Sequence, residues 1–381
     1  MDLIRLGDIA TYINGYAFKP KDWREKGIPI IRIQNLNDPN KEYNYFDGEI
    51  DSKYLVNEGD ILISWSASIG VYEWRGQQGV LNQHIFKVDF NKIKIDKKYF
   101  KYIVSIALNR ALQYMHGSTM KHITKQYFDN ILIPVPLFDQ QIKIANILDQ
   151  AQELIDKRKA QIEALDELIQ SVFYDMFGDP GLNSKGWETG RISDIIVKTQ
   201  YGTSTKANET EGEYAVLRMN NITYSGNWDF KSLKYVDLDE KDREKYLVYK
   251  GEVLFNRTNS KELVGKTAVY KREEPMAYAG YLVKATPNNR ANGQFIASYM
   301  NTKYTKSLLF NMAKNIVGMA NINAEEFKNI KVYIPPIEIQ NQFAEIVESI
   351  EKQKELLNES LVELENNFNS LVQRAFKGEL F

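Results

Sequence analysis

The chain has 381 residues, is 43% hydrophobic and 12% aromatic, and carries a net charge of −1, a composition typical of globular domains rather than of disordered chains. It contains no cysteine, which excludes disulfides and thiolate zinc sites and favours a cytoplasmic location. No stretch reaches the roughly 20 apolar residues that a membrane span needs, so we expect a soluble, unprocessed chain.

The first 136 residues have the pattern of short strands around one helix. Apolar runs bounded by turn residues at 28–33, 60–64 and 80–86 predict strands. A helical pattern covers 98–114. Because Gly, Asn, Ser and Thr concentrate in the connections, residues 1–136 are predicted to form an α+β domain with polar loops.

A heptad pattern follows at 137–177. Apolar residues recur at steps of three and four from Ile144 to Met176, and Arg158 alone interrupts the stripe. A run this long predicts a coiled-coil helix about 60 Å in length. An ordinary amphipathic helix packed on its own module is the alternative.

Residues 178–336 repeat the first module. RLGDIA at 5–10 corresponds to RISDII at 191–196, IRIQNL at 31–36 to LRMNNI at 217–222, and GDILIS at 59–64 to GEVLFN at 251–256. Strands are predicted at 214–219 and 253–256, and a helix at 295–312. The offset between matched segments drifts along the chain, which places the length differences in loops.

The heptad pattern recurs at 337–381 in the same register, with Lys354 on its stripe. Because the first helix leads directly into the second module and the second helix starts from it, the helices can pair only in antiparallel orientation. The prediction is therefore two similar globular domains separated by two long helices in an antiparallel coiled coil, with pseudo-two-fold symmetry. Arg158 and Lys354 would face acidic residues, or extend into solvent instead. Those acidic residues are Glu363 and Glu365 for Arg158, and Glu163, Asp166 and Glu167 for Lys354.

The charge is unevenly distributed. The helical segments carry 4 Lys and Arg against 8 Asp and Glu in 137–177, and 4 against 9 in 337–381. The modules carry 18 against 15 in 1–136, and 23 against 18 in 178–336. A mild basic excess suits phosphate contact by the modules, and its small size predicts weak binding by the chain alone.

No catalytic pattern is apparent. The three histidines, His84, His116 and His122, lie in one module without the spacing of metal ligands. SKELVGKT at 260–267 ends like a nucleotide-binding loop but lacks its first glycine and the helix that should follow. The Asn/Asp-Pro-Pro-aromatic loop of amino-group methyltransferases, a glycine-rich cofactor loop and a Gly-x-Ser-x-Gly elbow are also missing. We expect no catalytic residue, metal or cofactor in this chain.

Several segments, in this order and partly duplicated, resemble the specificity subunit of type I restriction-modification systems. They are RLGDIA, GDILIS, GSTMKHITKQYFDNILIPVPLFDQQ at 117–141, FYDMFGDP at 173–180 and RAFKGELF at 374–381. The resemblance covers the whole chain. It implies two target-recognition domains, 1–136 and 178–336, two helical spacers, 137–177 and 337–381, and double-stranded DNA as the ligand.

The same resemblance implies protein partners. Two adenine methyltransferase subunits would dock at the helices, and restriction or translocase subunits would join the full complex. S-adenosylmethionine, ATP and Mg would be used by those partners, because methylation requires an adenine flipped out of the duplex into another subunit. This chain would read a bipartite, asymmetric target, with one half-site per domain and a spacer set by the coiled coil.

The candidates for DNA contact are polar residues in or beside loops, since Arg, Lys, Asn and Gln form bidentate bonds to bases, and Ser, Thr and Tyr adapt to them. In the first module they are Arg32, Gln34, Asn35, Ser66, Ser68, Gln77, Gln78, Asn82, Gln83, His84, Ser118, Thr119, Lys121 and His122. In the second they are Tyr201, Arg218, Asn220, Asn221, Arg257, Thr258, Asn259, Lys266, Tyr278, Asn315 and Asn321. The pairs Arg32/Arg218 and Asn35/Asn221 match across the repeat, which favours a phosphate or scaffold role. The unmatched loops at 64–84 and 256–280 are the predicted specificity loops.

Two other functions stay open at the level of the sequence. One is a duplicated coiled-coil adaptor whose modules bind protein partners, against which the basic modules and polar loops count modestly. The other is a self-sufficient nuclease or methyltransferase, which lacks every expected catalytic signature.

Overall fold

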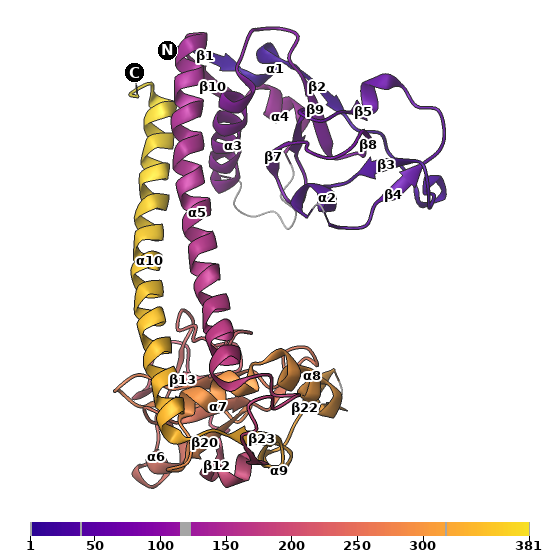
Figure 1. The fold of residues 1–381 in the computed structure, drawn as a ribbon. Coiled ribbons are helices and arrows are strands. Elements are labelled where there is room, and N and C mark those ends of the chain that lie inside the picture. The colour runs from indigo at the N-terminus through magenta and orange to yellow at the C-terminus, as the bar shows by residue number, and fades with distance from the viewer. Residues whose placement is uncertain (1, 39, 115–122, 317, 381) are drawn as a thin grey trace. The chain divides into compact units, whose positions relative to one another are not determined.

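The computed structural model describes residues 2–38, 40–114, 123–316 and 318–380 (Figure 1). The chain divides into two units, one formed by residues 1–158 with 360–381 and the other by residues 159–359. Each unit contains one globular module and a part of each of two long helices, α5 (Phe138–Phe177) and α10 (Ile337–Lys377). The predicted α+β class with two long helices is confirmed.

The elements of the first module are short. Its strands are β1 (Asp2–Arg5), β2 (Thr11–Asn14), β3 (Ile28–Ile31), β4 (Asn44–Phe46), β5 (Leu55–Val56), β6 (Ile61–Ser64), β7 (Gly70–Glu73), β8 (Gly79–Leu81), β9 (Ile85–Asp89) and β10 (Leu132–Val135). Its helices are α1 (Leu6–Ile9), α2 (Ile33–Asn37), α3 (Lys97–Tyr114) and α4 (Lys125–Asp129), with 3-10 turns at Pro20–Asp22 and Ser52–Tyr54.

The strands of the second module follow the same order as those of the first, with additions, while some short helices and 3-10 turns differ. Its strands are β11 (Glu188–Arg191), β12 (Ile196–Tyr201), β13 (Tyr214–Leu217), β14 (Lys234–Val236), β15 (Leu247–Val248), β16 (Val253–Asn256), β17 (Thr258–Asn259), β18 (Thr267–Val269), β19 (Met276–Tyr278), β20 (Leu282–Pro287), β21 (Lys314–Ile316), β22 (Met319–Asn321) and β23 (Lys331–Ile334). Its helices are α6 (Glu240–Tyr246), α7 (Gly293–Met300), α8 (Lys303–Met312) and α9 (Ala324–Lys328), with a 3-10 turn at Ile192–Asp194.

The sheets of the two modules share one topology. The first module has sheets of order β2-β9-β6-β7 and β4-β3-β8-β5, and the second has β12-β20-β16-β18 and β14-β13-β19-β15. In each module one pair is parallel, β3 with β8 and β13 with β19. The first strand of each module also pairs with its last, β1 with β10 and β11 with β23. The sequence repeat is therefore a structural repeat.

Matched residues hold matched places in the cores. Phe128 and Phe327, which the repeat aligns, are both fully buried. Gly59 and Gly251 lie two residues before the matched strands β6 and β16. Their φ angles are 82° and 89°, a backbone conformation that glycine adopts without steric cost. The same scaffold is thus built twice from diverged sequence.

The two long helices pack against each other in antiparallel orientation (Figure 1). In the first unit, Ile144 and Leu148 near the start of α5 share a core with Phe368 and Ala375 near the end of α10. In the second unit the ends are exchanged, since the end of α5 packs on the start of α10. No residue of the predicted heptad stripe is exposed, as expected for a coiled-coil seam. The predicted pairing is confirmed.

A polar contact links the seam to the second module. The Lys354 ammonium forms an ion pair with Asp166 of α5, one of the acidic residues predicted to face it. Asp166 Oδ1 also accepts a hydrogen bond from Asn227 Nδ2 at 3.2 Å. The predicted pairing of Arg158 with Glu363 and Glu365 stays a prediction.

Two predicted elements are each broken in two, and the strands predicted at 28–33 and 214–219 end earlier, at Ile31 and Leu217. The apolar run 80–86 is not one strand but the end of β8 and the start of β9, because His84 between them turns the chain with φ of 72°. The helix predicted at 295–312 is two helices, α7 and α8, separated at 301–302. Thr302 starts α8 as its N-cap, since its side chain accepts the Thr305 amide. Periodicity in the sequence did not reveal either break.

Candidate nucleic-acid interface

Polar and aromatic side chains gather where β12 and β16 end and β20 begins in the second module. The Arg257 guanidinium lies 4.8 Å from the centre of the Tyr201 ring, and its Nη1 donates to the Gly280 carbonyl at 3.2 Å. The Tyr201 hydroxyl accepts a hydrogen bond from the Ala324 amide at 3.0 Å. These contacts hold an arginine in a fixed pose at a partly exposed edge.

A small added sheet, β17-β22-β21, continues from Arg257. Asn321 Nδ2 on β22 donates to Thr258 Oγ1 on β17 at 2.7 Å. The backbone of Asn315 pairs with Ala320 in the same sheet, while its side chain lies outside what the structure describes. Tyr201, Arg257, Thr258 and Asn321 are four predicted DNA-contact residues that the fold brings together, and we call them the second-module cluster.

Trp65 holds the same backbone position in the first module. Its amide donates to the His84 carbonyl at 3.2 Å, as the Arg257 amide donates to a carbonyl in the β19–β20 turn at 3.0 Å. Trp65 Nε1 donates to Asn14 Oδ1 at 3.2 Å, and Asn14 ends β2 as Tyr201 ends β12. We call Asn14, Trp65 and His84 the first-module cluster. Equivalent positions in the two modules carry different chemistry on the same backbone.

Several buried polar atoms in or beside these clusters have no hydrogen-bond partner within the described ranges. They are Asn82 Oδ1 and His84 Nδ1 in the first module, and Arg257 Nε in the second. Buried polar atoms are nearly always paired in folded proteins. A nucleic acid lying against these loops could supply the missing partners.

The other predicted residues of the first specificity loop are partly or fully exposed. Ser66, Ser68, Gln77, Gln78 and Gln83 lie in the turns around β7 and β8. Gln78 Nε2 is held by Asn57 Oδ1 at 2.8 Å. Asn259 occupies a half-buried position on β17. Their exposure is compatible with DNA contact, and no contact of the structure tests it.

The matched asparagines, Asn35 and Asn221, have the same interior role in both modules. Asn35 Oδ1 accepts the Arg32 amide at 3.2 Å and Asn221 Oδ1 accepts the Arg218 amide at 2.8 Å. Both side chains are nearly fully buried, and both donate back to carbonyls of the following loop. This geometry supports the scaffold alternative.

The matched arginines also bind protein groups. Arg32 Nη1 donates to Asn44 Oδ1 at 3.0 Å, and Arg218 Nη2 donates to the Ser232 carbonyl at 2.8 Å. Gln34 Nε2 makes a longer bond, 3.3 Å, to the Glu42 carbonyl. Asn220 is exposed in the turn after β13. Of these residues, Asn220 has the freest access to a ligand.

Lys266 and Tyr278 lie inside the second module, which argues against base contact by either. Lys266 Nζ donates to the carbonyls of Met219 and Ile222, and burial lowers the pKa of its ammonium. Tyr278 is fully buried, its hydroxyl donates to the Lys245 carbonyl at 3.0 Å, and burial raises its pKa.

Some predictions lie outside the described residues, and some contacts were not predicted. Ser118, Thr119, Lys121 and His122 fall within 115–122, which the structure does not describe. Asn14 and Trp65 were not predicted. Aligning the ends of β2 and β12 across the repeat is the signal that could have found Asn14.

Within the described ranges, no group of three or more His, Asp and Glu side chains is placed to hold a metal ion. No described helix is both long and apolar enough to cross a membrane.

Comparisons with known proteins identify the family of the chain. The family model described as type I restriction modification DNA specificity domain matches residues 1–164 and 184–366. The EcoBI specificity subunit of Escherichia coli is 24% identical over 418 residues, covering 99% of this chain and 85% of that protein. The MjaVIII specificity subunit of Methanocaldococcus jannaschii is 23% identical over 401 residues, covering 100% and 92%.

Two solved structures are also similar over nearly the whole chain. A chain of a type I R-M system gives a TM-score of 0.62 at 15% identity, covering 100% of this chain and 98% of that one. The S subunit of M. genitalium gives 0.54 at 14% identity, covering 98% and 96%. At these identities the likeness establishes the fold.

Proposed function

The chain belongs to the type I restriction modification DNA specificity family, and we propose that it selects the DNA target for partner subunits while catalysing no reaction itself. The proposed reading domains are 1–136 and 178–336, each contacting one half-site of double-stranded DNA. Two methyltransferase subunits would dock at the helices, with restriction or translocase subunits in the full complex. S-adenosylmethionine, ATP and Mg would be used by those partners. Because its ligand is DNA, we expect the chain in the cytoplasm.

One observation carries the proposal. The two modules place different side chains on the same backbone positions, Asn14 and Trp65 in the first and Tyr201 and Arg257 in the second. An arginine at a groove edge reads guanine, whereas an asparagine amide favours adenine. A shared scaffold with exchanged reading residues supports an asymmetric target of two different half-sites.

The helices supply two further supports. Leucines and a valine off the heptad stripe are exposed although they are apolar, with exposed fractions of 53% for Leu154, 66% for Leu356 and 57% for Val362. Exposed apolar side chains on an otherwise charged helix favour a protein partner. The helical segments between the modules would also set the number of unread base pairs.

Selection of binding sites from random-sequence DNA tests the proposal. The full chain, bound to its methyltransferase partner, should enrich two short fixed blocks at constant spacing. Replacing residues 178–336 by the matching module of a relative should change one block and leave the other. Enrichment of no paired blocks would sink the proposal and favour the adaptor alternative.

A change of helix length tests the role of the spacer. Deleting seven residues from both helices removes whole heptads and keeps the seam in register. The selected blocks should stay the same while the gap between them shortens. An unaltered gap would contradict the role of the helices as spacer, and leave base reading by the modules standing.

A further inference from the structure

Helices α3 and α7 are equivalent elements, and one hydrogen bond fixes their alignment. The Asp96 amide donates to Gln141 Oε1 at 2.9 Å, and the Asn292 amide donates to Gln340 Oε1 at 2.9 Å. Gln141 and Gln340 are themselves matched by the sequence repeat. This anchor aligns three positions: Lys98 with Gln294, Lys101 with Ala297 and Tyr102 with Ser298.

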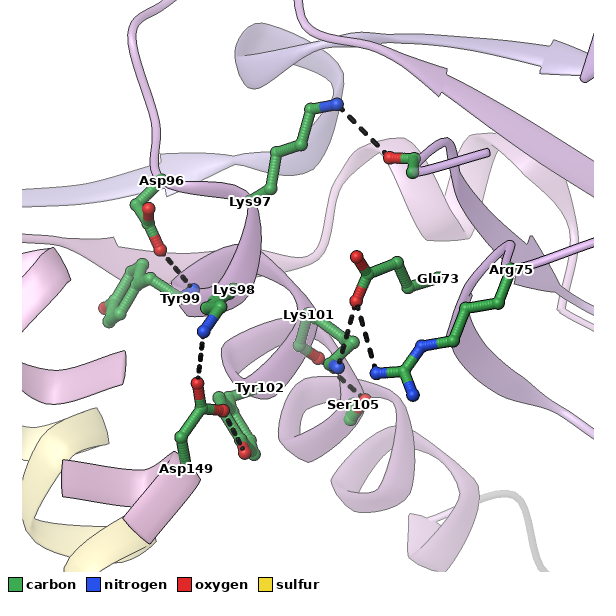
Figure 2. Close-up of polar contacts among 11 residues, drawn as sticks. Glu73, Arg75, Asp96, Lys97, Lys98, Tyr99, Lys101, Tyr102, Ser105 and Asp149 are labelled. Atoms are coloured by element: carbon green, nitrogen blue, oxygen red, sulfur yellow. Dashed lines mark hydrogen bonds and ion pairs between the residues drawn. The ribbon is translucent and has the colours of Figure 1, made fainter. Parts of the chain in front are cut away.

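Large charged and aromatic side chains fill these positions in the first module (Figure 2). Lys98 Nζ and the Tyr102 hydroxyl both donate to Asp149 of α5, each at 2.7 Å. The Lys101 ammonium lies 3.7 Å from a carboxylate oxygen of Glu73 on β7. The Lys101 ammonium and the Tyr102 phenol thus occupy space beside α3, while the Lys98 side chain is 59% exposed at its edge.

The second module has shorter side chains at all three positions, and a cavity of about 550 Å³ lies there. Gln294, Ala297 and Ser298 line it from α7, with residues of α5, α10, β18 and the loop 225–230 on the other sides. Glu73 is also replaced, because Val269 has the same register on β18 that Glu73 has on β7. The volume is within the range of sites that bind small molecules.

Among the residues that the structure describes, two acceptor atoms of lining residues are buried without a hydrogen-bond partner, Gln294 Oε1 and Asn301 Oδ1. Asn301 Nδ2 donates to the carbonyls of Thr267 and Ala297 at 2.6 and 2.8 Å, which fixes the orientation of its amide. Gln294 Nε2 donates to Ser298 Oγ at 3.0 Å. In both amides the NH2 group therefore donates to protein atoms, while the oxygen accepts no hydrogen bond from them. An unpaired acceptor calls for a donor.

The cations that line the cavity are already engaged. Lys271 and Lys354 form ion pairs with Glu351 and Asp166. The Arg272 guanidinium lies 3.6 Å from the centre of the Phe230 ring. The connection 222–233 that supplies this wall is longer than its counterpart 36–43 in the first module. It also places Trp228 at the cavity, with Nε1 fixed by the Val269 carbonyl at 2.8 Å.

We propose that this cavity binds a small organic cation carrying ammonium or guanidinium groups. Its N–H groups would donate to the amide oxygens of Gln294 and Asn301, and its apolar part would lie against Trp228. The cationic groups of the ligand would thus correspond to the ammonium groups of Lys98 and Lys101 in the first module. The cation has two possible sources, a free polyamine or a basic side chain of a partner protein. The proposal does not depend on base reading.

Calorimetric titration of the full chain tests this site, with spermidine as one probe and N-acetyl-L-argininamide as the other. We expect saturable binding of at least one probe at one site per chain, and none of 1,8-octanediol, a neutral chain of similar length. Preference for spermidine assigns the site to a free polyamine, and preference for the argininamide assigns it to a partner's side chain. No saturable binding of either cation overturns the proposal.

Variants separate this cavity from general attraction to the acidic helices. Gln294→Leu removes one unpaired acceptor at similar size and should weaken binding by about tenfold or more. Ser298→Tyr installs the first-module residue and should abolish binding by filling the space. Glu345→Gln, which removes an exposed charge of α10 outside the cavity, should leave binding unchanged. Equal binding by Gln294→Leu and the unaltered chain overturns the proposal, even if Ser298→Tyr fails to fold.

Discussion

The first and second modules share most of their backbone structure. They differ mainly in the side chains at equivalent positions. Both keep the two four-stranded sheets and the buried asparagine that caps the turn after β3 or β13. They exchange Trp65 for Arg257 at the loop edge, and Lys101 for Ala297 beside the long helices. The two copies therefore keep the sheets and the buried asparagine, and differ at the loop edge and beside the long helices.

The largest expected effect tests the shared part of this comparison. Phe343→Ala should destabilise the second unit by about 3–5 kcal/mol, because Phe343 is fully buried and packs against Phe173 and Phe177. Its counterpart on the stripe is Ile144, and Ile144→Ala should cost the first unit about 2–5 kcal/mol. Urea unfolding followed by far-UV circular dichroism measures the loss in each variant. An effect of Phe343→Ala below 1 kcal/mol would contradict a packed helix seam.

The buried asparagines give a second test of the shared scaffold. Asn35→Ala and Asn221→Ala should each cost roughly 2–3 kcal/mol of unfolding free energy, because each leaves a backbone amide and a carbonyl without partners. Thermal unfolding measures the loss. Selected DNA sequences should stay the same for either variant, and a changed base preference would give these residues a reading role instead.

A variant of Arg257 tests the loop-edge side chains, which differ between the two modules. Arg257→Ala should weaken binding by about 1–3 kcal/mol and relax the selected sequence in the half-site of the second module only, if the guanidinium reads a guanine. Arg290→Ala, which removes an arginine of the same module that pairs with Glu188 outside the second-module cluster, is the matched control and should preserve the preference. Weaker binding with an unchanged base preference would point to phosphate contact instead.

The smallest effect concerns a lysine on α8. Burial lowers the pKa of Lys306 from 10.5 to about 8, so the unfolded chain holds more protons than the folded chain between these values. Stability should therefore rise with pH across that window. Lys306→Met should flatten the rise in a series of melting temperatures. A slope that Lys306→Met does not change would assign the titration to another group.

More of the fold than of the candidate site could be predicted from the sequence. Heptad steps and repeat matches depend on local spacing, which is why the helix pair and the duplication could be predicted before any contact was known. The break at Thr302 was missed because a cap depends on one side-chain bond, and the apolar pattern continues through it. Periodicity does not report single bonds.

Candidate contacts depend on residues distant in the chain. The bond between Asn14 and Trp65 joins positions 51 residues apart, and no spacing rule pairs them. Composition also could not separate Tyr278, buried with its hydroxyl engaged, from Tyr201, which is exposed beside Arg257. Side-chain type suggests which residues can bind a base. Tertiary packing decides which of them are accessible to a base.

The pairing of β1 with β10, and of β11 with β23, bears on how the gene segment for one module could be exchanged. Asp2 stands opposite Val135, and Glu188 opposite Ile334, so each module enters and leaves its fold at neighbouring points. A gene segment bounded by these strands would encode a piece that closes on itself and meets the rest of the chain at one place. Under the proposed function, exchange of such a segment would give a new combination of half-sites without a change to the helices.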